Sequence, residues 1–477
     1  MDEGRRRRRR RGEDRLSGLP DELLHVILVG LRSVRAAART SLLSRRWRHI
    51  WTQIPQLVLF NRDETSPVLF LDYVDSALAA HSAPAIELLS ILLPDTNSVP
   101  ACRVAPWLRG ASQRVVGTIN VYVPRKMSRH DHDLREEEEL EIPSCGGATR
   151  ILLNLDQRWR LRFQLGGLFA ALSHLTILSA RVEGSDLSCL VSTMCPCLES
   201  LLIGVSVTLP TVSGVSMRTD SLQSLVFYAN TRRLEVIAPR LQQLTLCDVE
   251  SHMISAPKLA KLHWNGNGHD PRQHEFADVP CHLQLLKINR KSVVASLLQR
   301  FDSVDELKLG ITVPREGYRS FLNETDRLPK CETLSVSVLL NHHGLVPVLL
   351  HLLRRCCTTR KLSIGLYNSD GYHTMYSCPS SCPCHLAKNC KIPDITLRSL
   401  EEVEISNFTS SPEELKFVEQ LSRCNAAVLK RIIIRYTRWP HTPLTKDVCE
   451  KVRSKCRANL DVEFYVSSDM KNWVSFD

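Results

Sequence analysis

The sequence predicts an α/β fold in which a small helical unit precedes a long series of short strands. Three observations indicate this. A stretch near the N-terminus, residues 14–51, has apolar residues at helical spacing. The motif Leu-x-x-Leu-x-apolar then recurs through the middle of the 477-residue chain. A strand–helix–strand pattern follows the last clear copies, over residues 395–434.

The first stretch reads DRLSGLPDELLHVILVGLRSVRAAARTSLLSRRWRHIW and predicts three short helices. Leu19 and Pro20 are expected to begin the first helix. Proline has no backbone N–H, but an N–H at the first helical position would have no partner within the helix, so nothing is lost. Asp21 follows in the first turn, where the helix dipole favours acids. Ser33 and Ser44 are expected to cap the second and third helices. Apolar residues at helical spacing define one face of the first helix: Leu23, Leu24, Ile27, Leu28 and Leu31.

Roughly forty residues cannot bury so much apolar surface without help. Each large apolar side chain left in water forgoes about 1.5–3 kcal/mol of burial. Trp47 and Trp51 lie on one side of the third predicted helix, where they can serve as core or as partner anchors. Arg45, Arg46 and Arg48 lie on the other side, as a solvated face. The stretch is therefore expected to dock on another protein.

At these residues the chain resembles the plant form of the F-box, which reads D-R-L-S-x-L-P-D-E-L-L-x-x-I-L-S-x-L and then R-T-S-x-L-S-x-R-W-R-x-L-W. The match covers residues 14–24, 27–28 and 39–51. It departs at Val29-Gly30, where the family has Ser, and at Arg32, where it often has Pro. Neither departure removes an apolar contact.

The resemblance implies a three-helix F-box over residues 14–54 that binds a Skp1-like adaptor, and through it a cullin and a RING subunit. The adaptor-binding side chains are expected to lay an apolar face into a groove of the partner. They are Leu19, Pro20, Leu23, Ile27, Leu28, Leu31, Leu43 and Trp47.

Residues 57–60 and 115–123 are predicted strands, and residues 70–80 and 104–114 are predicted helices. A polar insert follows at residues 126–141 and contains four consecutive glutamates. Its charge predicts an exposed loop.

The repeat dominates the chain from there. Its copies begin 18 to 27 residues apart, around the period of leucine-rich repeats. One unit cannot bury its apolar face alone, so stacked units are expected to form a curved parallel sheet along an irregular solenoid over residues 55–394. Eight copies disfavour unrelated strands of another α/β fold. The copies begin at Leu172, Leu198, Leu222, Leu241, Leu259, Leu283, Val304 and Cys331, and weaker ones follow.

Residues 395–408 and 428–434 are predicted strands, with a helix at residues 412–423 between them. The strings L-x-x-L-E-E-V-E-I-x-N-F and E-E-L-x-F-V-x-x-L resemble the FBD domain, which trails plant F-box and leucine-rich-repeat proteins. The resemblance implies an FBD-like α/β cap over residues 395–477. A helix near residues 446–456 and a strand at residues 460–466 are also expected.

The net charge is +11, of which residues 1–12 supply +5 through seven arginines. The remainder is only mildly basic, so a global nucleic-acid surface is not expected. The arginine run, residues 1–13, is either a disordered tail or a nuclear-import or nucleic-acid patch. No apolar run is long enough for a membrane span, and no secretory signal is recognised. The 17 cysteines are therefore expected to be reduced, in the nucleus, the cytoplasm or both.

Catalytic motifs with nucleophilic, metal-dependent or nucleotide chemistry are absent from the sequence. Thiols and an imidazole gather at Cys378, Cys382, Cys384, His385 and Cys390, which is the chemistry of a zinc site. Their spacing fits none of the standard zinc patterns, so a reduced cysteine-rich loop over residues 368–394 is the preferred interpretation. The sequence His130-Asp131-His132-Asp133 is a weaker candidate than this cluster. No cofactor and no metal are expected.

Two functions fit these patterns. The first is a non-catalytic substrate receptor of an SCF-type ubiquitin ligase, with the F-box on the adaptor and the repeats on a target protein. The second is a repeat scaffold outside ubiquitination, with the nucleus as one expected location, that uses the arginine run for nucleic acid. The sequence does not identify the target.

Overall fold

The computed structural model describes residues 18–43, 45–60, 67–93, 99–124, 138–164, 166–209, 214–247, 249–266, 268–289, 295–312, 318–339, 345–356, 358–367, 395–437, 444–467 and 472–476. The arginine run, the predicted cap Ser44, His130–Asp133 and the cysteine cluster of residues 378–390 lie outside these ranges. The chain divides into two compact units, one of residues 1–198 with 206–210, and one of residues 199–205 with 211–477.

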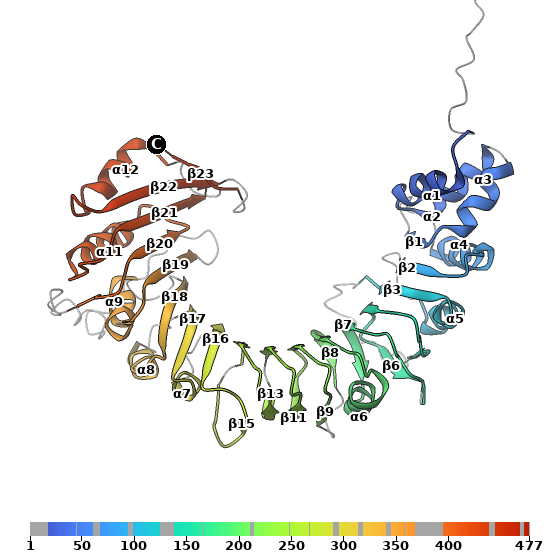
Figure 1. Cartoon of the computed structure of the whole chain (residues 1–477), viewed down its shortest axis with the longest axis horizontal. Helices are drawn as coiled ribbons and strands as arrows, with labels where there is room; N and C mark the ends of the chain where they lie inside the picture. Colours follow the sequence, from blue (N-terminus) through green and yellow to red (C-terminus); the bar gives the residue numbers. More distant parts are fainter. Residues whose placement is uncertain are drawn as a thin grey trace, which may run out of the picture. The chain divides into compact units, whose positions relative to one another are not determined.

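The first unit begins with three short helices, α1 (Asp21–Gly30), α2 (Val34–Arg39) and α3 (Arg45–Ile50) (Figure 1). The 3-10 turn η1 (Thr40–Leu42) precedes α3, and η2 (Trp51–Gln53) follows it. The predicted cap of α2 is confirmed, because Oγ of Ser33 accepts from the Ala36 amide at 3.3 Å. Pro20 lies at the N-cap of α1, one residue before the expected position.

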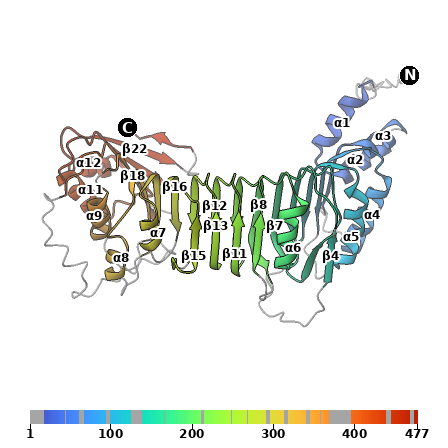
Figure 2. The ribbon, with the colours of Figure 1, turned by 60° about the horizontal axis from the view of Figure 1, so that its bottom comes forward.

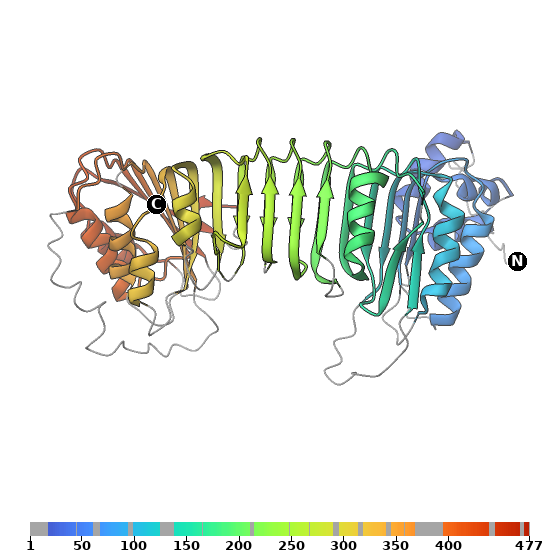
Figure 3. The ribbon, with the colours of Figure 1, turned by 90° about the horizontal axis from the view of Figure 1, so that it is seen from below.

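A parallel sheet follows in the same unit. Its strands pair in the order β1 (Gln56–Phe60), β2 (Ile86–Leu92), β3 (Val115–Tyr122), β5 (Arg150–Asn154) and β7 (His174–Val182). Strand β4 (Glu138–Ile142) pairs with β6 (Trp159–Phe163), which pairs with the end of β7. Helices α4 (Pro67–Ala80), α5 (Ala101–Ser112) and α6 (Gly184–Cys189) cover one face (Figure 3), and the π-helical turn η3 (Leu190–Met194) continues α6.

Strand β4 corrects the prediction that residues 126–141 form a loop throughout. Leu140 and Ile142 are buried, whereas Glu139 and Glu141 between and beside them are exposed. This alternation is that of a half-buried strand, and the run of glutamates hid it. Residues 126–137 of the insert lie outside the described ranges.

The second unit is built on a longer parallel sheet, in which each strand pairs with the next strand of the same sheet. Its strands are β8 (Ser200–Thr208), β10 (Ser224–Phe227), β12 (Gln243–Leu246), β14 (Lys261–Trp264), β16 (His282–Asn289), β17 (Ser303–Ile311), β18 (Lys330–Leu339), β19 (Lys361–Tyr367), β20 (Glu402–Ser406), β21 (Arg431–Thr437) and β22 (Asp461–Ser467). The short β23 (Val474–Ser475) pairs antiparallel with β22.

The second apolar residue of each repeat lies beside its equivalent in the next strand. Leu225 pairs with Leu244, Leu244 with Leu262, and Leu262 with Leu286. These side chains are at most 1% exposed, and so they form one continuous buried row. The predicted parallel sheet of stacked repeats is confirmed in this unit.

Four of the segments that return from the strands of this sheet are themselves strands. These form a second parallel sheet of β9 (Val215–Arg218), β11 (Thr231–Ile237), β13 (Val249–Ser255) and β15 (His274–Ala277), of which β11, β13 and β15 are labelled in Figure 2. Leu234 and Val236 of β11 are fully buried. Further along, helices follow the strands: α7 (Ala295–Arg300), α8 (Tyr318–Glu324), α9 (Leu345–Arg355), α11 (Pro412–Arg423) and α12 (Lys446–Arg453).

The sheet does not break at the predicted boundary between residues 394 and 395, because β20 pairs directly with β19. The strand expected over residues 395–408 covers only Glu402–Ser406, and Thr396 forms a single bridge to Asn425. The helix predicted for residues 412–423 is confirmed as α11. Among the helices of the described ranges, none is both long and apolar enough to cross a bilayer.

Candidate functional site

Six large apolar side chains remain exposed on and beside α1 and η1. They are Leu23 (49% exposed), Val26 (67%), Ile27 (40%), Leu31 (43%), Leu42 (86%) and Leu43 (65%), and are called here the helical apolar surface. Single exposed apolar residues are ordinary in proteins. Six in so short a stretch mark a candidate protein-interaction surface.

Helix α1 is apolar on two sides, and only one of them contacts the core. Leu24 and Leu28, four residues apart, are 0% and 1% exposed. Leu23 and Ile27, each one position earlier, lie about 100° around the helix and remain in water. One side of α1 therefore stabilises the helical unit, and the other is available to a partner.

The structure corrects the predicted list of adaptor-binding residues. Leu28 and Trp47 are 1% and 4% exposed, so they hold the helices together and cannot contact a partner directly. Pro20 is exposed and Leu19 half-buried beside α1. Val26 and Leu42 were missed, although Val26 lies three residues after Leu23, a spacing that places two side chains on one helical face. The role of this surface in adaptor binding remains a prediction.

A second candidate surface is the face of the long sheet that carries the residues between the buried anchors. Toward its end this face holds a network of ion pairs. Lys361 Nζ lies 2.8 Å from Glu402 and 3.8 Å from Glu404. Arg435 lies 3.0 Å from Glu404, and Arg431 contacts both Glu402 and Glu463. The network draws on four neighbouring strands, β19 to β22, so only the folded sheet assembles it.

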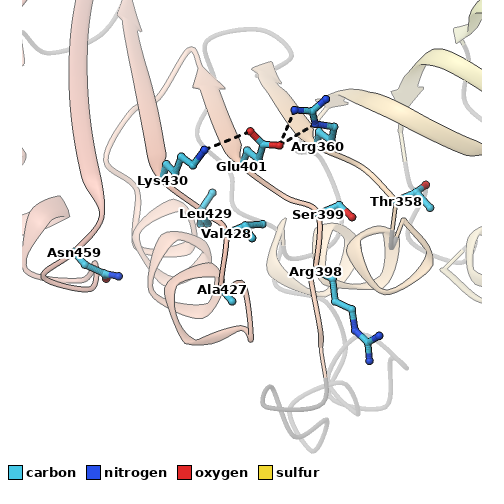
Figure 4. Close-up of a pocket in the computed structure, with 10 residues that line it drawn as sticks. All are labelled: Thr358, Arg360, Arg398, Ser399, Glu401, Ala427, Val428, Leu429, Lys430 and Asn459. Carbon is cyan, nitrogen blue, oxygen red and sulfur yellow. Dashed lines mark hydrogen bonds and ion pairs between the residues drawn. The ribbon is translucent and has the colours of Figure 1, made fainter.

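A pocket of about 690 Å³ opens where the chain enters β19, β20 and β21 (Figure 4). The Glu401 carboxylate lies between Lys430 and Arg360 and accepts from Arg360 Nε at 2.9 Å. Lys430 Nζ lies 3.8 Å from the same carboxylate. The hydrogen bond to Glu401 also raises the pKa of Arg360. Three cations, Arg360, Arg398 and Lys430, and one carboxylate line the pocket, an arrangement that suits binding better than proton transfer or nucleophilic attack.

Metal binding finds no support in the described ranges, where no three or more His, Cys, Asp or Glu side chains are grouped to hold an ion. The cysteine cluster of residues 378–390 and the sequence His130–Asp133 are outside those ranges. The proposal of zinc there is therefore neither supported nor contradicted.

Comparison with known proteins finds relatives, although no family model matches the chain. An F-box/FBD/LRR-repeat protein of Arabidopsis thaliana is 30% identical over 246 residues, 49% of this chain and 55% of that protein. A second protein of that description is 28% identical over 272 residues, 53% of this chain and 54% of that protein. An FBD-associated F-box protein is 28% identical over 344 residues, 67% of this chain and 72% of that protein. The chain thus spans about half the length of the first two relatives.

Proposed function

Because the chain belongs to the plant family of F-box, leucine-rich-repeat and FBD proteins, we propose that it is the substrate-recognition subunit of an SCF-type ubiquitin ligase. In this proposal helices α1 to α3 are the F-box and bind a Skp1-like adaptor, which links the chain to cullin and RING subunits. The repeat sheets bind a target protein. Residues 395–477 are the FBD-like end of the chain, and the protein acts in the nucleus, the cytoplasm or both.

The observation that carries the adaptor role is the helical apolar surface. Burial of a half-exposed leucine or isoleucine in a partner groove contributes about 1 kcal/mol or more. Together, six such side chains supply enough free energy to offset the translational and rotational freedom that two proteins lose on association, and so to form a stable interface. The same helices keep a separate core, centred on Leu24, Leu28 and Trp47, so the surface is not needed to hold them together.

The proposed mechanism is positioning. A receptor that holds a target beside the ubiquitin-charged conjugating enzyme raises the effective concentration of the target's lysines at the thioester. The chain needs no catalytic group of its own for this. The ion pairs of Arg360 and Lys430 with Glu401 in the pocket agree with a binding role.

Adaptor binding by the purified full-length chain tests the proposal. The variant Val26→Ser/Ile27→Ser removes two exposed members of the helical apolar surface and leaves Leu24 and Leu28 in place. Its affinity for the adaptor, measured by calorimetry, should fall about tenfold or more. The control Leu69→Ser/Val116→Ser removes two other exposed apolar side chains of the same unit (62% and 48% exposed) and should bind normally. Equal affinity of both variants would refute the assigned surface.

The alternative, a scaffold that binds nucleic acid through the arginine run, depends on residues outside the described ranges. Such binding would weaken steeply with added salt. Deletion of residues 1–12 should abolish it, so nucleic-acid binding that survives the deletion would exclude the run as its cause.

A further inference from the structure

Three neighbouring strands of the long sheet place basic side chains next to one another. His263 of β14 pairs in register with Lys287 of β16, and Lys287 pairs with Lys308 of β17. Paired strands lie about 4.8 Å apart, so the three side chains span only about 10 Å on one face. Lys261 lies two residues before His263 and therefore on the same face. These four residues are called here the basic row.

The charge of the basic row is not compensated within the described residues. Lys308 contacts Glu306 of its own strand at 3.1 Å. Among the described residues this is the one ion pair that the basic row makes. Three lysines against one glutamate leave an excess of two positive charges. The half-buried His263 lies among them, and its Nε2 has no hydrogen-bond partner in the described part of the chain.

The end of the same sheet provides an internal contrast. Its cations Lys361, Arg431 and Arg435 contact the carboxylates of Glu402, Glu404 and Glu463, which balances the charges. One part of the face is thus neutralised by the protein itself, and the neighbouring part is not. Unpaired charge on a half-buried surface is compensated either by solvent ions or by a partner of opposite sign.

We propose that the basic row is the docking site for an acidic, extended segment of a partner protein. The inference deepens the proposed function, since the partner would be the target of the receptor. Carboxylates of the segment would lie between Lys287 and Lys308 and accept a hydrogen bond from His263. Burial and the three neighbouring lysines lower the pKa of His263 in the free protein, and a bound carboxylate would raise it.

An acidic peptide fits this surface better than nucleic acid does. Leu285 pairs in register with Lys261 and is half-buried beside the row, where it offers an apolar contact to a peptide side chain. Glu306 lies in the next strand of the same register row and repels any anion, so the row offers no unbroken line of cations to a phosphate backbone. A mixture of cations, one acid and an apolar residue suits a segment that alternates acidic and apolar residues.

The test uses the full chain and a fluorescein-labelled peptide of alternating Glu and Leu, with fluorescence anisotropy as the readout. Lys287→Gln/Lys308→Gln should weaken binding of this peptide about five- to tenfold. Lys258→Gln/Lys416→Gln, which removes two exposed lysines elsewhere in the same unit, should leave it unchanged. Carbodiimide, which joins a carboxylate to an adjacent amine without a spacer, should cross-link the wild-type complex at Lys287 or Lys308.

Equal binding by the two double variants, or cross-links distributed over exposed lysines, would overturn the proposal. So would tighter binding of a single-stranded oligonucleotide that the Lys287/Lys308 variant weakens, because the site would then select nucleic acid. Adaptor affinity is measured on the same variants and should not change. A failure of the basic row is therefore distinguishable from a failure of the adaptor surface, which only the α1 variants probe.

Discussion

Arg46 of α3 binds Asp21 at the start of α1, with 2.8 Å between Nε of Arg46 and Oδ1 of Asp21. The Arg46 side chain also donates from Nη2 to the carbonyl oxygen of Leu19 at 2.7 Å. The two side chains are 39% and 59% exposed, so the pair adds little to the free energy of unfolding. Its consequence is geometric, because it sets where α1 begins relative to α3.

Arg46→Ala should therefore weaken adaptor binding more than it destabilises the fold. We expect a loss of affinity of up to about fivefold, equivalent to an exposed ion pair of about 0.2–1 kcal/mol. Calorimetry with the adaptor and urea unfolding measure the two effects. Arg48→Ala, which removes another exposed charge from α3, is the control. If the link acts as described, Asp21→Ala should add nothing to Arg46→Ala.

Trp47→Ala should destabilise the helical unit by about 3–5 kcal/mol, since Trp47 is only 4% exposed and its removal leaves a cavity. Leu42→Ala should change the free energy of unfolding by less than about 0.5 kcal/mol, because Leu42 is 86% exposed. Circular dichroism with urea measures both. Adaptor affinity of the folded protein should fall for Leu42→Ala. A stable Trp47→Ala protein would contradict the assignment of Trp47 to the core.

Acid should destabilise the larger unit through His252, which is buried in its second sheet, and the half-buried His269 beside it. His252 pairs with Leu234 on one side and His274 on the other, so it occupies a core position (3% exposed). Burial, then the neighbouring His274 and His269, lower the pKa of His252 to about 3, and burial and His274 lower that of His269 to about 4. Below pH 6.5 the unfolded chain binds these protons and the folded protein does not.

The free energy of unfolding should therefore fall by about 1.4 kcal/mol per pH unit for each such histidine, from pH 6.5 down toward its folded pKa. His252→Leu introduces the residue type of Leu234, which pairs with His252 in the neighbouring strand. This variant should reduce the dependence of the free energy of unfolding on pH. His49→Leu, at an exposed position, should not. Urea unfolding between pH 7 and pH 4 provides the comparison, and parallel curves for the two variants would count against the mechanism.

Glu414→Ala should cost about 2–3 kcal/mol, because Glu414 completes the cap of α11 from a buried position (2% exposed). Its carboxylate accepts from the amides of Thr409 at 2.8 Å and Ser411 at 3.1 Å, and from Oγ1 of Thr409 at 2.9 Å. Thermal unfolding measures the loss. Glu413→Ala, at the adjacent residue, should have a much smaller effect, and similar losses for both would rule out the cap as the cause.

The repeat was predictable because its signal is local. The spacing of apolar residues within each copy is sufficient to identify β8, β10, β12, β14, β16, β17 and β18. Helix α11 was predicted to the residue for the same kind of reason, the helical spacing of Leu415, Val418 and Leu421. The second sheet was missed, although Leu234-Glu235-Val236 of β11 alternates apolar and polar residues, because so short an alternating segment does not indicate which partner it will pair with.

For the candidate sites, the sequence by itself determined which residues are apolar or basic, and it placed α1 in a helical unit with more apolar surface than that unit can bury. Only the tertiary structure decided that Leu28 and Trp47 are core while Val26 and Leu42 are surface, because α1 is apolar on two sides and its neighbours select one. Lys287 and Lys308 are 21 residues apart in the chain, and only the strand register makes them adjacent. Composition and spacing act along the chain, whereas burial and charge pairing depend on what the fold brings beside each residue.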